Sequence, residues 1–265
     1  KIKVNNYGFR SDKNYFRNKK NVISIIGDSY VEAIQVPYKD TFMNVFDEEI
    51  NGKYNVYSFG FSGAPLSQYL KWAEYSTKNF NSEYVVFNIV SNDFDESLYK
   101  YKNSKGFHFF KKCGEDYCNK LVPYKKKKYR WIIKSNLIRY LIFNVQILNI
   151  KEKIIRKFNI LKNKDYYISN MVFSTDKERV TDSKNAINIF FNKINILNIK
   201  KKNVFFIIDG RFYGEKNIEN SFFYIMREYF LKECKMKGFN CIDMKKHFDV
   251  HYEMNQQKFS LEKDG

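Results

Sequence analysis

The stretch Val22-Ile23-Ser24-Ile25-Ile26-Gly27-Asp28-Ser29 says most about how this chain folds. The apolar run 22–26 predicts a buried strand, which stops at a glycine, an acidic residue and a serine. The glycine permits a sharp turn, so the serine is left at the start of a helix, where free N–H groups and a partial positive charge meet its hydroxyl. Such a serine is suited to act as a nucleophile. The same residues are also ordinary in strand-to-helix loops and helix caps, so the tripeptide alone leaves both interpretations open.

Two later segments repeat the pattern of a buried strand that ends in polar or glycine residues. Residues 56–63 form a short apolar strand followed by a loop with two glycines, and residues 84–93 form a strand that ends in Ser-Asn-Asp. Three strands that each precede a helical stretch predict a parallel sheet, whose ligands bind at the carboxyl ends of the strands. Ser29, Gly60 and Asn92 all lie at these ends. Backbone N–H groups of Ser29 and Gly60, with the Asn92 amide, are donors of the kind that an oxyanion hole needs.

In the order and spacing of these residues, the chain resembles the SGNH (GDSL-like) hydrolase superfamily. Ser29, Gly60 and Asn92 match its first three sequence blocks, although Val90 stands where the third block usually has a glycine. Three further segments resemble a bacterial, envelope-associated branch: Asn5-Asn6-Tyr7-Gly8-Phe9-Arg10, Ser135-Asn136-Leu137-Ile138-Arg139-Tyr140-Leu141 and Val204-Phe205-Phe206-Ile207-Ile208-Asp209-Gly210-Arg211. The resemblance implies a three-layer α/β/α fold of the flavodoxin-like SGNH type, with a mainly parallel sheet.

The resemblance also implies a catalytic Asp and His near the C-terminus. Lys263-Asp264-Gly265 would be the start of the branch's closing Asp-Gly-His-Trp-Asn motif, which makes Asp264 the partner of a His that follows Gly265. The sequence also begins without Met, so we expect a fragment trimmed at both ends. Asp249-Val250-His251 is the only Asp-x-His within the chain and is the internal alternative for a base, which we do not favour. His108 has no carboxylate near it in the sequence, and we interpret it as a surface residue.

Length and composition predict a single α/β domain over residues 1–265. A chain of this length can bury a substantial core, and its residues are 44% hydrophobic and 18% aromatic. We expect a basic, mainly helical insertion at about 99–176, which contains Lys125-Lys126-Lys127-Lys128. It is either a lid or a patch for an anionic envelope surface, or a helical subdomain with solvated lysines, and we favour the subdomain.

The formal net charge of +18 invites a nucleic-acid interpretation. The cations are spread over the whole chain, and we find no zinc-finger spacing, helix-turn-helix pattern or RNA-binding aromatic signature. We therefore expect no nucleic-acid partner.

The four cysteines form two close pairs in the sequence. Cys113 and Cys118 could close a small loop, and Cys234 and Cys241 lie at the end of a helix and the start of the next strand. Neither pair has the two-residue spacing of a zinc site, and we expect no metal or other cofactor. The even number of cysteines fits disulfides, and we expect a periplasmic or cell-envelope location; four free buried thiols in a cytoplasmic protein are the alternative.

The predicted chemistry is acyl transfer through an ester of Ser29, with Asp28 and Asp93 in structural roles. The resemblance implies an ester or O-acetyl hydrolase, or an O-acetyl transferase, that acts on an acylated carbohydrate of the cell envelope. The competing hypothesis is a non-catalytic SGNH-like module that binds an acylated glycan or a partner protein.

Overall fold

The computed structural model describes residues 2–124, 135–143, 176–195, 197, 199–210 and 221–256. The chain divides into two compact units, one formed by residues 1–122 with 168–265 and the other by residues 123–167. The second unit contributes one described helix, α4 (Asn136–Phe143). The predicted insertion at about 99–176 includes this second unit, and its lysine run at 125–128 lies outside the described residues.

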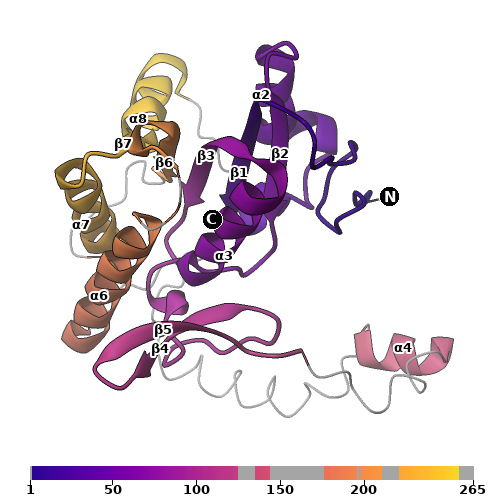
Figure 1. Cartoon of the computed structure of the whole chain (residues 1–265). Helices are drawn as coiled ribbons and strands as arrows, with labels where there is room; N and C mark the ends of the chain where they lie inside the picture. Colours follow the sequence, from indigo (N-terminus) through magenta and orange to yellow (C-terminus); the bar gives the residue numbers. More distant parts are fainter. Residues whose placement is uncertain are drawn as a thin grey trace. The chain divides into compact units, whose positions relative to one another are not determined.

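The first unit is built on a five-stranded, fully parallel sheet in the order β2-β1-β3-β6-β7 (Figure 1). The strands are β1 (Val22–Gly27), β2 (Asn55–Gly60), β3 (Ser82–Ile89), β6 (Val204–Ile208) and β7 (Asn240–Asp243). The first strand, β1, lies inside the sheet, with β2 on one side of it and β3 on the other. This flavodoxin-like order places the topological switch point between β1 and β3, where open parallel sheets bind their ligands.

Helices cover both faces of the sheet, which gives the three layers that the sequence predicts. On one face lie α3 (Leu66–Phe80), α6 (Lys177–Ile194) and α7 (Phe222–Met236), which share the larger core with alternate strand residues such as Phe87 and Phe206. On the other face α2 (Phe42–Glu49) lies over the sheet, and α8 (Met244–Asn255) follows β7 and contacts β6. The two cores follow the period of two along each strand: Val85 and Phe87 face the first, Tyr84 and Val86 the second. The predicted fold class is therefore confirmed.

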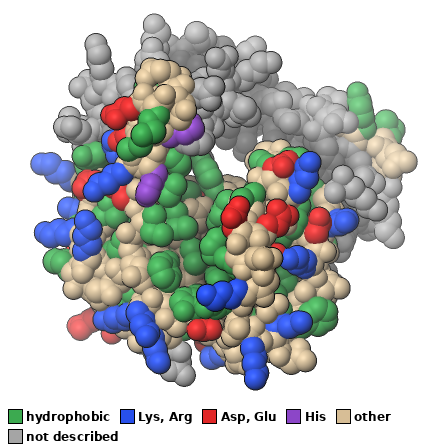
Figure 2. Space-filling view, turned by 90° about the horizontal axis from the view of Figure 1, so that it is seen from above, with side chains coloured by type: hydrophobic (Ala, Val, Ile, Leu, Met, Phe, Trp, Pro, Cys, Tyr) green, Lys and Arg blue, Asp and Glu red, His purple; other side chains and the backbone are tan. Residues whose placement is uncertain are grey.

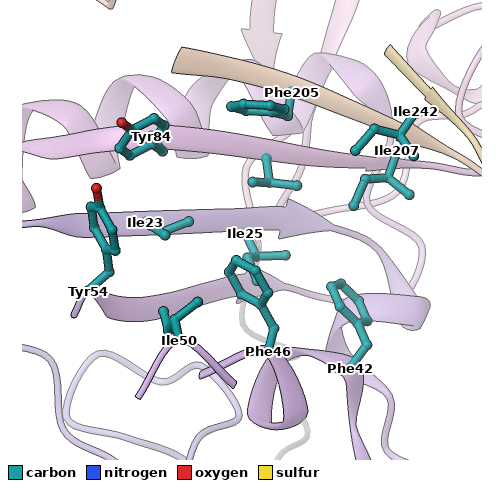
Figure 3. A pocket seen from close by; sticks show the side chains of 11 residues that line it. Ile23, Ile25, Phe42, Phe46, Ile50, Tyr54, Tyr84, Phe205, Ile207 and Ile242 are labelled. Atoms are coloured by element: carbon teal, nitrogen blue, oxygen red, sulfur yellow. The ribbon is translucent and has the colours of Figure 1, made fainter. Parts of the chain in front are cut away.

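The second face of the sheet carries an apolar groove of about 410 Å³ (Figure 3). The aromatic rings of Phe42 and Phe46 reach over it from α2, and Ile207 and Ile242 rise from the strands at its other side. Hydrophobic side chains gather in a hollow in the view of Figure 2. The remaining lining residues are Ile23, Ile25, Ile50, Tyr54, Tyr84, Val86 and Phe205.

A two-stranded antiparallel hairpin interrupts the helical insertion that the sequence predicts. It consists of β4 (His108–Cys113) and β5 (Asp116–Leu121), and a disulfide joins Cys113 to Cys118 across its turn. The hairpin is held to the start of α3, because the Ser67 hydroxyl donates to the His108 carbonyl over 2.7 Å. Neither six-residue strand alternates polar and apolar residues, so the sequence carries no period-two signal that would separate this hairpin from a lysine-rich loop.

The second disulfide joins Cys234, in α7, to Cys241, in β7. The Cα atoms are 6.5 Å apart in this pair and 5.8 Å apart in the hairpin pair, both within the range that disulfides span. Among the described residues, no helix is long and apolar enough to cross a membrane.

Candidate active site

Ser29 lies directly after the central strand β1, at the switch point of the sheet. Asp28 precedes it as the N-cap of α1 (Ser29–Glu32), and its Oδ1 accepts the Tyr30 N–H over 3.0 Å. The Ser29 hydroxyl is partly exposed and lies 3.4 Å from Asp28 Oδ2. The helix is only one turn long, because Ala33 adopts a left-handed conformation with a φ of 46°. The helix dipole that the sequence analysis expects at Ser29 is therefore small, and the local N–H groups remain as the source of positive potential.

Gly60 ends the neighbouring strand, in register with Gly27 of β1. A Cβ at Gly60 would lie 2.6 Å from the Glu32 backbone nitrogen, and one at Gly27 would lie 2.4 Å from Val31 Cγ2. Real Cβ atoms do not approach other atoms so closely, so the α1 backbone excludes a side chain at Gly60, and the Val31 side chain would have to move to admit one at Gly27. The two glycines let the turn that carries Ser29 lie directly against the ends of β1 and β2.

Asn92 follows β3 on the other side of β1. Its Nδ2 donates one hydrogen to Glu96 Oε2 over 3.0 Å, and its buried Oδ1 has no hydrogen-bond partner among the described residues. An amide nitrogen carries two hydrogens, so a second one is available for a ligand. Val90, which replaces the usual glycine, is only 2% exposed and packs inward, and its N–H donates to Asp93 Oδ2 over 2.8 Å.

Two buried carboxyl groups lie beneath these strand ends. Asp28 is 2% exposed and Asp93 is fully buried, and Asp93 Oδ1 also accepts the Tyr69 hydroxyl over 2.8 Å. Burial raises the pKa of Asp28 to about 6, against the hydrogen bonds that lower it. Burial and the nearby charge of Asp28 raise the pKa of Asp93 well above its ordinary value. Asp28 thus caps the turn that carries Ser29, and Asp93 joins the loop after β3 to α3.

Two further carboxylates connect the three loops, and neither is expected from the sequence. Glu32, at the end of α1, accepts the backbone N–H of Ser62 over 2.7 Å and also its hydroxyl. Glu96 accepts from Asn92 and from the Lys102 ammonium, which in turn donates to the Gly63 carbonyl over 2.9 Å. The loops after β1, β2 and β3 are thus tied to one another. A hint was present in the sequence, since Glu96 follows Asn92 by four residues, the spacing at which side chains meet on a turn of helix.

Arg10, from the segment that resembles the envelope-associated branch, closes the other end of α1. Its Nη1 donates to the Glu32 carbonyl over 2.8 Å and to the Ala33 carbonyl, and its Nη2 donates to the Val36 carbonyl. A short helix leaves its last carbonyls without partners, and the planar guanidinium satisfies several at once. The lead-in segment therefore fixes the turn that carries Ser29.

The three histidines lie on two elements, His108 at the start of β4 and His247 and His251 in α8. In α8, Asp249 pairs with Lys245, and residues two apart, such as Asp249 and His251, point to different sides of a helix. His108 is half-buried rather than a surface residue, and its ring Nδ1 lies 2.9 Å from Gln68 Oε1. Burial lowers the pKa of the His108 ring. Asp264 lies outside the described residues. Within the described ranges, no three His, Cys, Asp or Glu side chains are grouped so as to hold a metal ion.

Neither family models nor curated protein sequences match the chain. Solved structures do match it, among them a member of the lipolytic protein G-D-S-L family from Veillonella parvula DSM 2008, with 11% identity, a TM-score of 0.41, and coverage of 89% of this chain and 84% of that one. A carbohydrate acetylesterase family member from Sinorhizobium meliloti matches with 7% identity, a TM-score of 0.42, and coverage of 85% and 84%. The acetyl xylan esterase AlAXEase matches with 10% identity, a TM-score of 0.43, and coverage of 89% and 83%. At these identities and TM-scores, function has to be argued from the chain's own residues.

Proposed function

We propose that this protein is a serine-dependent esterase or O-acyl transferase of the SGNH type. The observation that carries the proposal is the convergence of Ser29, Gly60 and Asn92 on the carboxyl ends of three adjacent strands, β1, β2 and β3, at the switch point of the sheet. Each of the three is fixed by a different contact: Asp28 caps the turn of Ser29, α1 packs on Gly60, and Glu96 holds Asn92. A partly exposed hydroxyl beside N–H donors is suited to acyl transfer.

In the proposed reaction, Ser29 Oγ attacks an ester carbonyl while its proton passes to a histidine oriented by Asp264, the arrangement that the resemblance implies. The carbonyl oxygen becomes an oxyanion, which accepts hydrogen bonds from the N–H groups of Ser29 and Gly60 and from the Asn92 amide. When the tetrahedral intermediate collapses, the C–O bond to the alcohol breaks, and the alcohol leaves with the proton. Water or a sugar hydroxyl then removes the acyl group from Ser29, which distinguishes a hydrolase from a transferase.

The proposed substrate is an O-acetylated carbohydrate of the cell envelope, and the proposed location is the periplasm or the cell surface. The substrate class comes from the sequence resemblance. The pairing of all four cysteines in disulfides supports an oxidising compartment.

The proposal is tested by ester hydrolysis in the full-length protein. We expect release of acetate from a small aryl acetate, loss of this activity in Ser29→Ala, and a fall in kcat of about a hundredfold in Asn92→Ala, as for other oxyanion donors. Ser104→Ala, in an exposed loop, is the matched control and should retain full activity. Equal rates for the wild type and Ser29→Ala would refute the role of Ser29 and would favour a non-catalytic module that binds an acylated glycan or a partner protein.

A sugar acceptor separates the two enzymatic outcomes. A transferase should acetylate the added sugar at the expense of free acetate, whereas a hydrolase should release the same acetate with or without it. Mass spectrometry of the sugar, together with the acetate yield, measures this partition.

A further inference from the structure

The amide of Asn92, a partly buried side chain, has one satisfied and one unsatisfied polar atom. Its Nδ2 is bonded to Glu96, while its Oδ1 is shielded from water and has no partner among the described residues. An unsatisfied buried oxygen carries a free-energy penalty, so some other interaction has to hold the amide in this orientation.

Glu96 supplies that interaction. An ionised carboxylate only accepts hydrogen bonds, so the amide must present its NH2 group to Glu96 and turn its oxygen away. The side chain of Glu96 is 29% exposed and is paired with the Lys102 ammonium, whose side chain is 19% exposed. With Glu96 as the fixed acceptor, one hydrogen of Asn92 Nδ2 is occupied and the direction of the other is determined by the planar geometry of the amide.

Lys102 gives this arrangement a second function. A lone carboxylate close to Asn92 would repel an oxyanion that forms at the same amide, because like charges interact strongly where water is scarce. The Lys102 ammonium offsets that charge. Through its bond to the Gly63 carbonyl, it also ties the loop that follows Gly60 to the loop that carries Asn92. Two predicted oxyanion donors from different strands are thereby linked through a single cation.

We propose that Glu96, held by Lys102, is a positioning residue that orients the Asn92 amide so that its second N–H faces the oxyanion of the reacting ester. This inference rests on the proposed function, since it presupposes that Asn92 donates to an oxyanion. Glu96 itself does not touch the substrate, and its effect on the rate passes entirely through Asn92.

A double-mutant cycle in the full-length protein tests this route. Glu96→Ala should lower kcat about tenfold and leave KM within about twofold, as expected when an outer partner of a reacting group is lost. Glu96→Gln should restore most of the rate, because its Oε1 can still accept from Asn92. In an Asn92→Ala background, Glu96→Ala should have no further effect. Glu74→Gln is the matched control, since Glu74 is a carboxylate held by Lys71 and Lys78 on α3 and should leave kcat unchanged.

A readout that is independent of activity is the Asn92 side-chain amide signal in a proton–nitrogen NMR spectrum, assigned by its absence in Asn92→Ala. The signal should shift in Glu96→Ala and stay in place in Glu74→Gln. An unmoved signal, a kcat loss that persists in the Asn92→Ala background, or a rise in KM with unchanged kcat would each overturn the inference. Full activity of Ser29→Ala would instead overturn the proposed function, and with it the role of Asn92, whatever the NMR signal shows.

Discussion

Asp28 and Asp93 are buried acids that the fold retains beneath the strand ends. Asp28 keeps a buried carboxyl because it caps α1, and Asp93 because it bridges the Val90 N–H and the Tyr69 hydroxyl. The pKa of each is raised, mainly by burial. Keeping these carboxyl groups ionised near neutral pH therefore lowers the stability of the protein. The hydrogen bonds that they accept offset part of this cost.

We expect the difference in unfolding free energy between Asp28→Asn and the wild type to favour the variant more at pH 7 than at pH 4. The pKa of Asp28 is about 6 in the folded protein against an ordinary value of 3.8, so the folded state binds a proton more tightly than the unfolded state. The wild type therefore loses stability as the pH rises through this range, by at most about 3 kcal/mol. Asparagine does not titrate and can still accept the Tyr30 N–H. Urea unfolding of both proteins at the two pH values measures the difference.

Asp176→Asn is the control for this comparison. Asp176 also caps a helix, since it accepts the Glu178 N–H over 3.0 Å, but it is exposed to water. A pH-independent difference between the wild type and Asp28→Asn would contradict the raised pKa of Asp28.

The packing of α1 on the ends of β1 and β2 determines where Ser29 lies. We expect Gly27→Ala and Gly60→Ala each to lower both stability and esterase activity, because the added Cβ meets atoms of α1. The obstacles differ: at Gly27 the nearest atom belongs to the Val31 side chain, whereas at Gly60 it is the Glu32 backbone nitrogen. Val31→Ala should therefore rescue much of the activity lost in Gly27→Ala, and much less of that lost in Gly60→Ala.

Thermal unfolding and aryl acetate hydrolysis of the two double variants measure this rescue. Equal rescue of both would show that α1 can shift as a unit, contrary to the close backbone contact at Gly60. Val31→Ala alone is the reference, since Val31 is itself buried and its truncation has a cost of its own.

Much of this arrangement was predictable from sequence, because strands and their ends leave local signals. The strands β1, β2 and β3 stand out as apolar runs that stop at glycine or polar residues, and Ser29, Gly60 and Asn92 follow from them. The single-turn length of α1 was not predictable, since it depends on the left-handed Ala33 and on Arg10, which is 19 residues upstream of Ser29. The bonds of Glu32 to Ser62 and of Lys102 to Gly63 join distant segments and leave no periodic signal.

Across the whole molecule, the disulfides bear on where the protein works. We expect the unreduced protein, unfolded in denaturant, to show no free thiol in a colorimetric titration, and four after reduction, because the structure pairs every cysteine. Protein isolated from its native host without reductant is the sample to use. Four free thiols in that sample would contradict the pairing and would remove its support for an envelope location.

Covalent labelling tests most directly whether Ser29 is the activated nucleophile that we propose. The full-length protein is incubated with a fluorophosphonate, which reacts readily only with an activated serine, and the site of any adduct is determined by peptide mass spectrometry. We expect a single adduct on Ser29 that is absent from Ser29→Ala and forms more slowly in Asn92→Ala. A protein that stays unlabelled, or that is labelled at another residue with Ser29 intact, would contradict the proposal.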